Sequence, residues 1–394
     1  MKPRHFALAP LLLPTLSPPS VAAESDSKLF DTSYQVYQED NNRMGITSYY
    51  LRQSIDIDAD TTFRFQYLRD AIAGYSPTGF LPGYEDQGLN FLDKVTDVRT
   101  AVLGALSRQF GDHRAELEAS SSDESDYKSE GVALSDAWSL NQKNTTLAFG
   151  VNYLSDKVKV SGIQAQGKRS LDFFTGITQV LDKNTVISAN LTLGNVNGYL
   201  NDPYKGLQRS ETYSYDDGTG NIVVVPYVTG YPENRPNRRF REVLQLEGTH
   251  LFDPLNGALD AVYRLSNDDF GVFSQCIQVE WRQAIGDKFA VIPFFRYYRQ
   301  SEANFYMQTL EGVAINSPDI NYPNATAPYY SADYRLSALD SVSVGLRLHY
   351  QFNDTFSGSV SYERYQMGGL GGNPAPTAAY PSASIWDFSL SAKF

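Results

Sequence analysis

The sequence ends in SIWDFSLSAKF, residues 384–394, and its last residue is a phenylalanine. Alternate residues of this stretch are apolar, and the residues between them are polar. The apolar set comprises Trp386, Phe388, Leu390, Ala392 and Phe394. Side chains of a β-strand point alternately to opposite faces, so this spacing predicts a strand with one apolar face. A terminal strand of a soluble sheet has the same pattern. This stretch alone therefore does not distinguish a strand that faces lipid from one that faces a soluble core.

The composition favours β-structure. The 394 residues include 27 tyrosines and 22 phenylalanines, and the mean hydropathy is −0.36. Aromatic residues are enriched in strands. Beyond the N-terminus no run of eighteen apolar residues occurs, which excludes membrane-spanning helices.

The N-terminus has the layout of a secretory signal peptide. Lys2 and Arg4 precede an apolar stretch that starts at Phe6, and a small-residue exit follows at Val21-Ala22-Ala23. We expect residues 1–23 to be removed and residues 24–394 to form a single domain. The remaining chain has 31 basic and 45 acidic residues, a formal net charge of −14, which disfavours nucleic acid as a partner.

Short and long connections alternate along the chain. Seven short turns, rich in Asp, Asn and Gly, close alternating runs near residues 58, 111, 142, 183, 254, 286 and 354. The longest connections between them are 74–94, 198–237 and 301–338. Strict alternation places the tight turns at one end of the strands and the variable loops at the other, as in outer-membrane barrels.

The alternation of short turns and long connections predicts sixteen strands. The even number places both chain ends on the short-turn side. They are expected at 30–38, 45–57, 61–73, 95–110, 113–122, 131–140, 145–155, 168–181, 185–197, 238–252, 257–268, 272–285, 288–300, 339–352, 356–366 and 384–394. The predicted fold class is all-β: a transmembrane antiparallel up-and-down β-barrel with short periplasmic turns and long extracellular loops.

Alternation within the strands supports a membrane barrel. In residues 342–352, Val, Leu, Tyr and Phe alternate with Ser, Gly, Arg, His and Gln. Four phenylalanines, Phe110, Phe252, Phe352 and Phe394, end runs on the short-turn side, where a membrane barrel carries an aromatic girdle. The terminal phenylalanine is therefore expected at the periplasmic interface.

Several stretches resemble a family of Gram-negative outer-membrane proteins classed as a domain of unknown function. They are YQEDNNRMGI (37–46), LRDAIAGYSPTG (68–79), KRSLDFFTGITQVLDKNT (168–185), FRYYRQSEANFY (295–306) and YYSADYRLSAL (329–339). The resemblance implies a barrel in the bacterial outer membrane, in contact with its lipid, and no established substrate. The last strand, with Trp386, Phe388, Leu390, Ala392 and Phe394, also resembles the C-terminal signal that the barrel-insertion machinery recognises.

The polar faces of the strands predict a lumen of mixed charge. The lumen-lining candidates are Arg52, Arg64, Arg99, Glu116, Glu118, Asp172, Arg241, Glu247, Glu280, Arg282, Arg296, Arg347 and Glu363. The direction of Arg296 stays open, because both faces of its run are aromatic. A barrel of about sixteen strands is wide enough for an aqueous channel unless loops plug it. Charges that pair between neighbouring strands and merely hydrate the interior are the alternative.

Two connections are candidates for a plug or a binding surface. Residues 198–237 contain a hairpin of their own, YSYDDGTGNIVVVPYV, and residues 301–338 are rich in tyrosine. DDGTGN lacks the spacing and closing glutamate of a calcium loop, so a plain β-turn is favoured. The acidic run SDESDYKSE (122–130) is typical of a solvated loop tip, although it could bridge cations to lipopolysaccharide phosphates.

No enzyme motif, cofactor site or metal site is expected. The chain lacks G-x-S-x-G, H-E-x-x-H and phosphate-loop patterns, and Cys276 stands alone. His113, His250 and His349 fall on strands too far apart to share a metal.

The sequence therefore predicts a channel or transporter for a small solute, without covalent chemistry. A plugged barrel that anchors a periplasmic or surface partner is the alternative, and an outer-membrane hydrolase is least favoured.

Overall fold

The computed structural model describes residues 29–159, 164–315 and 326–394, so the expected signal peptide lies outside the described residues. These ranges contain eighteen strands and five short 3-10 helices. The strands are β1 (Leu29–Glu39), β2 (Met44–Asp56), β3 (Thr61–Pro77), β4 (Leu92–Phe110), β5 (His113–Asp123), β6 (Tyr127–Leu140), β7 (Thr145–Val158), β8 (Gln166–Asp182), β9 (Thr185–Gly198), β10 (Gly206–Asp216), β11 (Ile222–Pro232), β12 (Arg238–Phe252), β13 (Gly257–Asp268), β14 (Phe273–Ile285), β15 (Phe289–Gln300), β16 (Leu339–Gln351), β17 (Phe356–Gly369) and β18 (Ser382–Lys393). The 3-10 helices are η1 (Asp40–Asn42), η2 (Glu85–Gln87), η3 (Asp253–Leu255), η4 (Tyr334–Leu336) and η5 (Thr377–Ala379).

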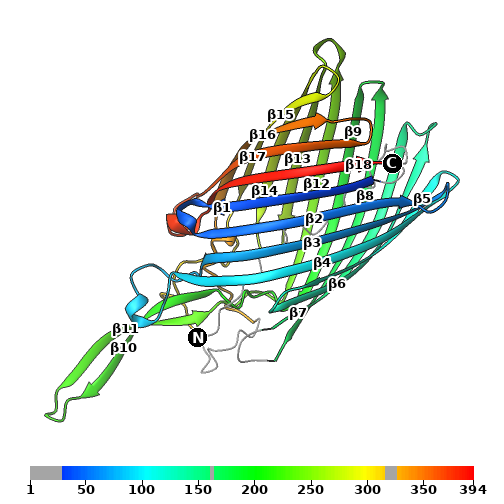
Figure 1. The fold of residues 1–394 in the computed structure, drawn as a ribbon. Helices are drawn as coiled ribbons and strands as arrows, with labels where there is room; N and C mark the ends of the chain where they lie inside the picture. The colour runs from blue at the N-terminus through cyan, green and yellow to red at the C-terminus, as the bar shows by residue number, and fades with distance from the viewer. Residues whose placement is uncertain (1–28, 160–163, 316–325) are drawn as a thin grey trace.

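Sixteen of the strands form one closed antiparallel barrel (Figure 1). Each strand pairs with its neighbours in the chain, except that β9 pairs with β12 across the 199–237 connection. The last strand returns to the first, where Phe388 lies opposite Tyr34. Closure leaves no edge strand, which is the arrangement that a sheet needs in lipid. The predicted fold class is therefore confirmed.

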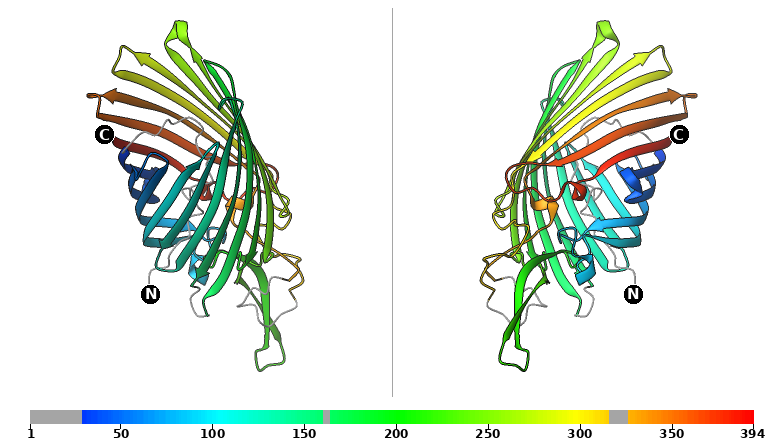
Figure 2. Two further views of the ribbon diagram at one scale, coloured as in Figure 1. Left: turned by 90° about the vertical axis from the view of Figure 1, so that its right-hand side faces the viewer. Right: turned by 90° about the vertical axis from the view of Figure 1, so that its left-hand side faces the viewer.

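The two remaining strands, β10 and β11, form a separate hairpin that projects beyond the barrel (Figures 1 and 2). It leaves the end that carries the long connections, opposite the end at which the C-terminus lies. Its turn contains the DDGTGN stretch, in which Asp217 N donates to Asn221 O at 3.1 Å. The predicted hairpin is confirmed.

Several strands are longer than predicted at the loop end. β3 continues to Pro77, β6 begins at Tyr127 and β17 runs to Gly369. The alternating pattern fades there, whereas backbone pairing continues, as between Tyr75 and Lys94. Pairing requires no particular side chain, so the hydropathy pattern underestimates it.

The two faces of the wall differ as the alternation requires. Large apolar side chains such as Val102, Leu117, Phe149 and Leu390 are exposed on the outer face. The last strand contributes Trp386 and Phe388 to this face in addition to Leu390. Among the described residues, no helix is long and apolar enough to cross a membrane.

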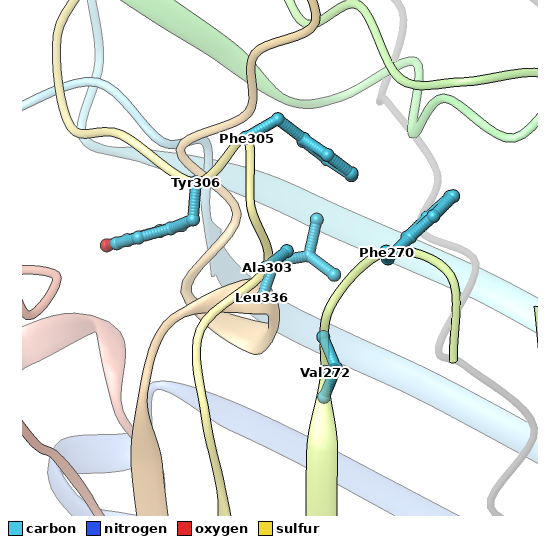
Figure 3. Close-up of a cluster of buried hydrophobic side chains, with 6 residues drawn as sticks. All are labelled: Phe270, Val272, Ala303, Phe305, Tyr306 and Leu336. Atoms are coloured by element: carbon cyan, nitrogen blue, oxygen red, sulfur yellow. The ribbon is translucent and has the colours of Figure 1, made fainter. Parts of the chain in front are cut away.

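Clusters of buried apolar side chains lie at the loop end of the barrel. One cluster joins Phe270 and Val272 of the β13–β14 connection to Ala303, Phe305, Tyr306 and Leu336 of the 301–338 connection (Figure 3). The rings of Phe270 and Phe305 meet edge to face, 4.9 Å apart. A second cluster joins Leu339 to the 370–381 loop through Ala375, Ala379 and Tyr380. The loop end therefore has its own hydrophobic core.

Candidate functional site: a cap and a charged lumen

The two longest connections pack against each other at the loop end. We call residues 199–237, 301–315 and 326–338 the cap. Asn234 and Tyr330 exchange two backbone hydrogen bonds of 2.9 Å, and Leu310 N donates to Gln208 O at 2.9 Å. Leu207 and Tyr231 from one connection share a buried cluster with Leu310, Tyr330 and Ala332 from the other. The cap is thus one packed unit built from both connections.

The first segment of the cap reaches across the barrel end. It leaves β9 at Gly198, and Gly206 N donates to Thr78 O, just after β3, at 2.9 Å. Lys205 Nζ also donates to the carbonyl of Pro77. Five strands, β4 to β8, separate β3 from β9 in the barrel. The segment therefore connects distant parts of the rim.

Backbones approach closely at this crossing. Gly79 has a φ of +98°, and a Cβ built there would lie 2.4 Å from Gly206 O. Only glycine combines a positive φ with so short an approach, since it has no Cβ. Tyr204 meanwhile packs against Met44, Ile72 and Val95, from β2, β3 and β4. Its hydroxyl donates to Asp126 in the β5–β6 connection.

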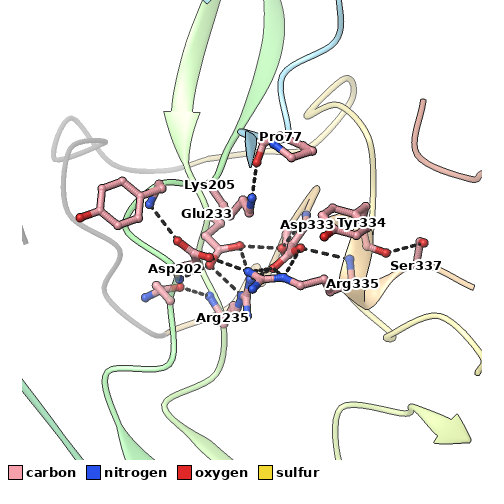
Figure 4. A network of polar contacts seen from close by, with 12 residues as sticks. Pro77, Asp202, Lys205, Glu233, Arg235, Asp333, Tyr334, Arg335 and Ser337 are labelled. Atoms are coloured by element: carbon pink, nitrogen blue, oxygen red, sulfur yellow. Dashed lines mark hydrogen bonds and ion pairs between the residues drawn. The ribbon is translucent and has the colours of Figure 1, made fainter. Parts of the chain in front are cut away.

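A buried network of ions holds the cap together (Figure 4). Arg235 lies 2.7 Å from Glu233 in its own connection and 2.8 Å from Asp333 in the other. Arg335 binds Asp333 and also Asp202, each at 2.5 Å. Asp333 and Arg335 belong to the same turn, where the Asp333 carboxylate accepts Arg335 N at the start of η4. The network therefore links both connections by side chains as well as by backbone.

Charges in the network balance. Three carboxylates, on Asp202, Glu233 and Asp333, face three cations, on Lys205, Arg235 and Arg335. Glu233 and Asp333 are only 1% exposed. Burial raises the pKa of Glu233, whereas Arg335, Lys205 and Arg235 overcome burial and hold the pKa of Asp333 below its usual range. Breaking a buried pair costs about 3–5 kcal/mol.

Lys205 is the cation in this network that loses its proton most readily. Burial lowers its pKa to about 8, against the attraction of Asp333 and Asp202. The side chain is 3% exposed and lies 5.9 Å from the ring centre of Tyr334. A small pocket at this point is lined by Lys205, Asp333 and Tyr334 together with Phe80, Phe91 and Tyr306.

The lumen wall is the second part of the site. Strand register places Arg52, Arg64, Arg99, Glu116, Glu118, Asp172, Arg241, Glu247, Glu280, Arg282, Arg296, Arg347 and Glu363 on the side opposite the exposed apolar side chains. Arg296, whose direction the sequence left open, lies in register with Gln278, and its Nε donates to that side chain at 3.0 Å.

Some of these wall charges pair across strands. Arg64 binds Glu116 at 2.8 Å and Glu118 at 3.4 Å, and Arg99 binds Asp70 at 2.6 Å. Arg347 and Glu280 lie farther apart, at 3.8 Å. The wall therefore presents both signs of charge, partly neutralised by neighbours. Such a surface favours water and small polar solutes over apolar ones.

The ion network was missed by reasoning from sequence. Asp333 and Arg335 lie in the YYSADYRLSAL stretch, but nothing in the local pattern shows that they meet Asp202 and Arg235 from a connection about a hundred residues away. The interpretation of SDESDYKSE as a solvated loop tip was wrong for Glu124 and Asp126. Both are buried, because the cap and the neighbouring strands cover the β5–β6 connection.

A closed sixteen-stranded barrel with an apolar outer face and a polar inner face defines the class: a membrane β-barrel of the outer-membrane type. The family described as Protein of unknown function (DUF3570) matches residues 90–166 and 159–382. The chain belongs to this family. The predicted resemblance is thereby confirmed.

Several solved structures are similar to this chain at low sequence identity. CdiB from Acinetobacter baumannii is 9% identical, with a TM-score of 0.51 over 93% of this chain and 60% of that one. The siderophore receptor PirA from Pseudomonas aeruginosa is 12% identical, with a TM-score of 0.44 over 94% of this chain. OpdK from Pseudomonas aeruginosa is 8% identical, with a TM-score of 0.42 over 93% of this chain and 97% of that one.

This chain spans 62% of the length of PirA. None of the curated proteins matches the sequence.

Proposed function

We propose that this protein is an outer-membrane channel for a small polar solute and that the cap gates its outer mouth. The observation that carries the proposal is the cap itself, in which one connection reaches across the barrel end and is joined to the other by a buried, charge-balanced network. A permanent seal could be built from apolar packing alone. Paired ions can separate and become hydrated, so they suit an element with two states.

The lumen supports the same proposal. The solute would meet Arg64, Glu116 and Glu118 on one side of the wall and Arg347 and Glu280 on another. Passage would be by diffusion between these groups once the cap has opened, with no bond made or broken. The mixed charges favour a zwitterionic or neutral polar solute over a strongly charged one. The location after signal-peptide removal, and insertion through the last strand, are parts of this proposal.

A reversible crosslink across the cap tests the gate. Gln208 and Thr309 form a parallel β-bridge between the two connections. Bridged strands lie about 4.8 Å apart, within the range that a disulfide spans. In a Cys276→Ser background, the pair Gln208→Cys and Thr309→Cys would lock the cap. The matched control is Ser210→Cys with Val228→Cys, which lie opposite each other within the hairpin and do not join the connections.

The readout is entry of small polar solutes into liposomes that contain the refolded barrel. We expect entry with the reduced cap and slower entry with the oxidised cap, and no redox effect in the hairpin control. Equal entry in both redox states of the lock would contradict gating by the cap. Absence of entry in a folded, reduced barrel would contradict the channel.

The second candidate is a plugged barrel that anchors a surface partner. It is favoured by the projecting hairpin, where Tyr213, Ile222 and Val224 are each about 60% exposed, at 61%, 66% and 58%. Large exposed apolar patches often mark interaction sites. Absence of solute entry in the liposome experiment would favour this candidate.

A further inference from the structure

Three carboxylates converge where the cap meets the β5–β6 connection. Asp97 lies on β4, and Glu124 and Asp126 lie in the connection itself. One carboxylate oxygen from each lies within 4.8 Å of the other two, and all three residues are buried. Two ligands about 2.4 Å from one calcium ion are at most about 4.8 Å apart. The spacing of the three oxygens is therefore compatible with shared ligation of one cation of that size.

Glu124 has an oxygen that the protein leaves unsatisfied. Its side chain is 8% exposed, and its Oε2 has no hydrogen-bond partner. A buried carboxylate oxygen without a partner is costly, because it has lost its water and gained nothing in return. A bound cation would remove this cost.

The other two carboxylates are held in place by the surrounding loops. Asp97 accepts Val98 N at 2.7 Å and Ser125 Oγ at 3.1 Å. Asp126 accepts the hydroxyl of Tyr204 from the cap. These bonds orient the two carboxylates, and a carboxylate oxygen can accept more than one contact.

Two cations lie near the cluster. The guanidinium of Arg99 binds Asp70 at 2.6 Å. Lys159 Nζ lies 3.4 Å from the Ser125 carbonyl oxygen. Within the described parts of the chain, neither cation forms an ion pair with Glu124.

We propose that Asp97, Glu124 and Asp126 bind a calcium ion at the loop end of the barrel. Oxygen-only ligands favour a hard cation, and calcium tolerates an irregular set of ligands better than magnesium, which requires a nearly ideal octahedron. The sequence predicted no metal site, since these residues lie far apart in the chain and the acidic run was interpreted as solvated. Because the hydroxyl of Tyr204 donates to Asp126, the ion would also stabilise the contact between the cap and the β5–β6 connection.

Calorimetric titration of the refolded barrel with calcium chloride tests the site. An ionic strength of about 0.15 M suppresses diffuse attraction by surface charges. We expect the unmodified barrel to bind one ion, and Glu124→Gln to weaken binding at least about tenfold by removing a charged ligand. Asp97→Asn, on a different strand, is expected to weaken it as well. Asp123→Asn removes the same charge from an exposed neighbour and serves as the matched control.

Several outcomes would overturn the proposal. They are no calcium-dependent heat in a barrel whose folding is verified by circular dichroism, tighter binding of magnesium than of calcium, and unchanged binding in Asp97→Asn. Equal weakening by Asp123→Asn and Glu124→Gln would likewise point to diffuse attraction by the acidic run. None of these outcomes bears on solute passage, so the calcium site and the channel are tested separately.

Discussion

The guanidinium of Arg235 lies 2.8 Å from the carboxylate of Asp333. This contact joins the two longest connections of the barrel, which are separated by about a hundred residues of sequence. Asp333 also binds Arg335, so one carboxylate contacts two guanidinium groups. We therefore expect the closed state of the cap to depend on this carboxylate.

Asp333→Asn tests that dependence. The amide keeps a side-chain oxygen to accept Arg335 N, but it removes the charge that Arg235 and Arg335 share. We expect the cap to lose about 3–5 kcal/mol of local stability. Faster hydrogen exchange of residues 199–237 and 326–338 would measure this loss, with the barrel strands unchanged. Asp217→Asn at the exposed hairpin tip is the control, and an equal effect of the two variants would refute the role of the network.

Leu310→Ala tests the apolar side of the cap. Leu310 is fully buried and packs in the cluster with Leu207 and Tyr231. A cavity at such a site costs about 2–5 kcal/mol. We expect rapid cleavage of the cap by protease while the barrel stays intact. Val224→Ala on the exposed hairpin should change the cleavage rate little, and an intact, resistant cap in Leu310→Ala would show that the cluster does not hold it.

Raising the pH should tighten the cap between about pH 8 and 10. The pKa of Lys205 is about 8 in the closed cap because burial disfavours its charge, whereas an exposed lysine has a pKa of about 10.4. Below pH 8 the Lys205 amine is charged in both the closed and the open cap, so the closed cap bears the full cost of burying that charge. Between the two pKa values the closed state releases the proton first, so its stability rises by about 1.4 kcal/mol per pH unit.

Cap opening measured by protease sensitivity at pH 7, 8 and 9 would check this slope, after correction with an unfolded substrate for the pH dependence of the protease itself. Lys205→Met should abolish the slope. A cap that loosens steadily over this range in the unmodified protein would contradict the assignment to Lys205.

Arg64→Ala tests the lumen wall. The substitution leaves Glu116 and Glu118 without their shared cation, so a barrel with its cap removed should become more selective for cations. The reversal potential across a salt gradient measures this change. Arg69→Ala, on the same strand β3 but on its opposite face, is the control. Equal shifts in both variants would show that Arg64 does not face the permeation path.

Much of the fold follows from the sequence because a membrane wall imposes a period of two on every strand. The predicted strands at 113–122 and 238–252 match β5 and β12 within one residue. Turn residues locate the short connections equally well, as at Asp253 to Asn256.

The cap could not be predicted in the same way. Its order comes from contacts between residues distant in sequence, such as Asp202 with Arg335 and Tyr204 with Asp126. No local period marks such residues, and acidic side chains in a loop suggest solvent. Only the fold reveals that Glu124 and Asp333 are buried.

The most direct test of the account is single-channel current through the intact barrel and through a barrel without its first capping connection. Asn197 lies opposite Arg238, so a two-residue Asn-Gly turn can replace residues 198–237 without disturbing strand pairing. The account predicts that the intact protein is closed most of the time and that the shortened protein carries a steady current. Identical steady currents, or silence from both folded proteins, would contradict it.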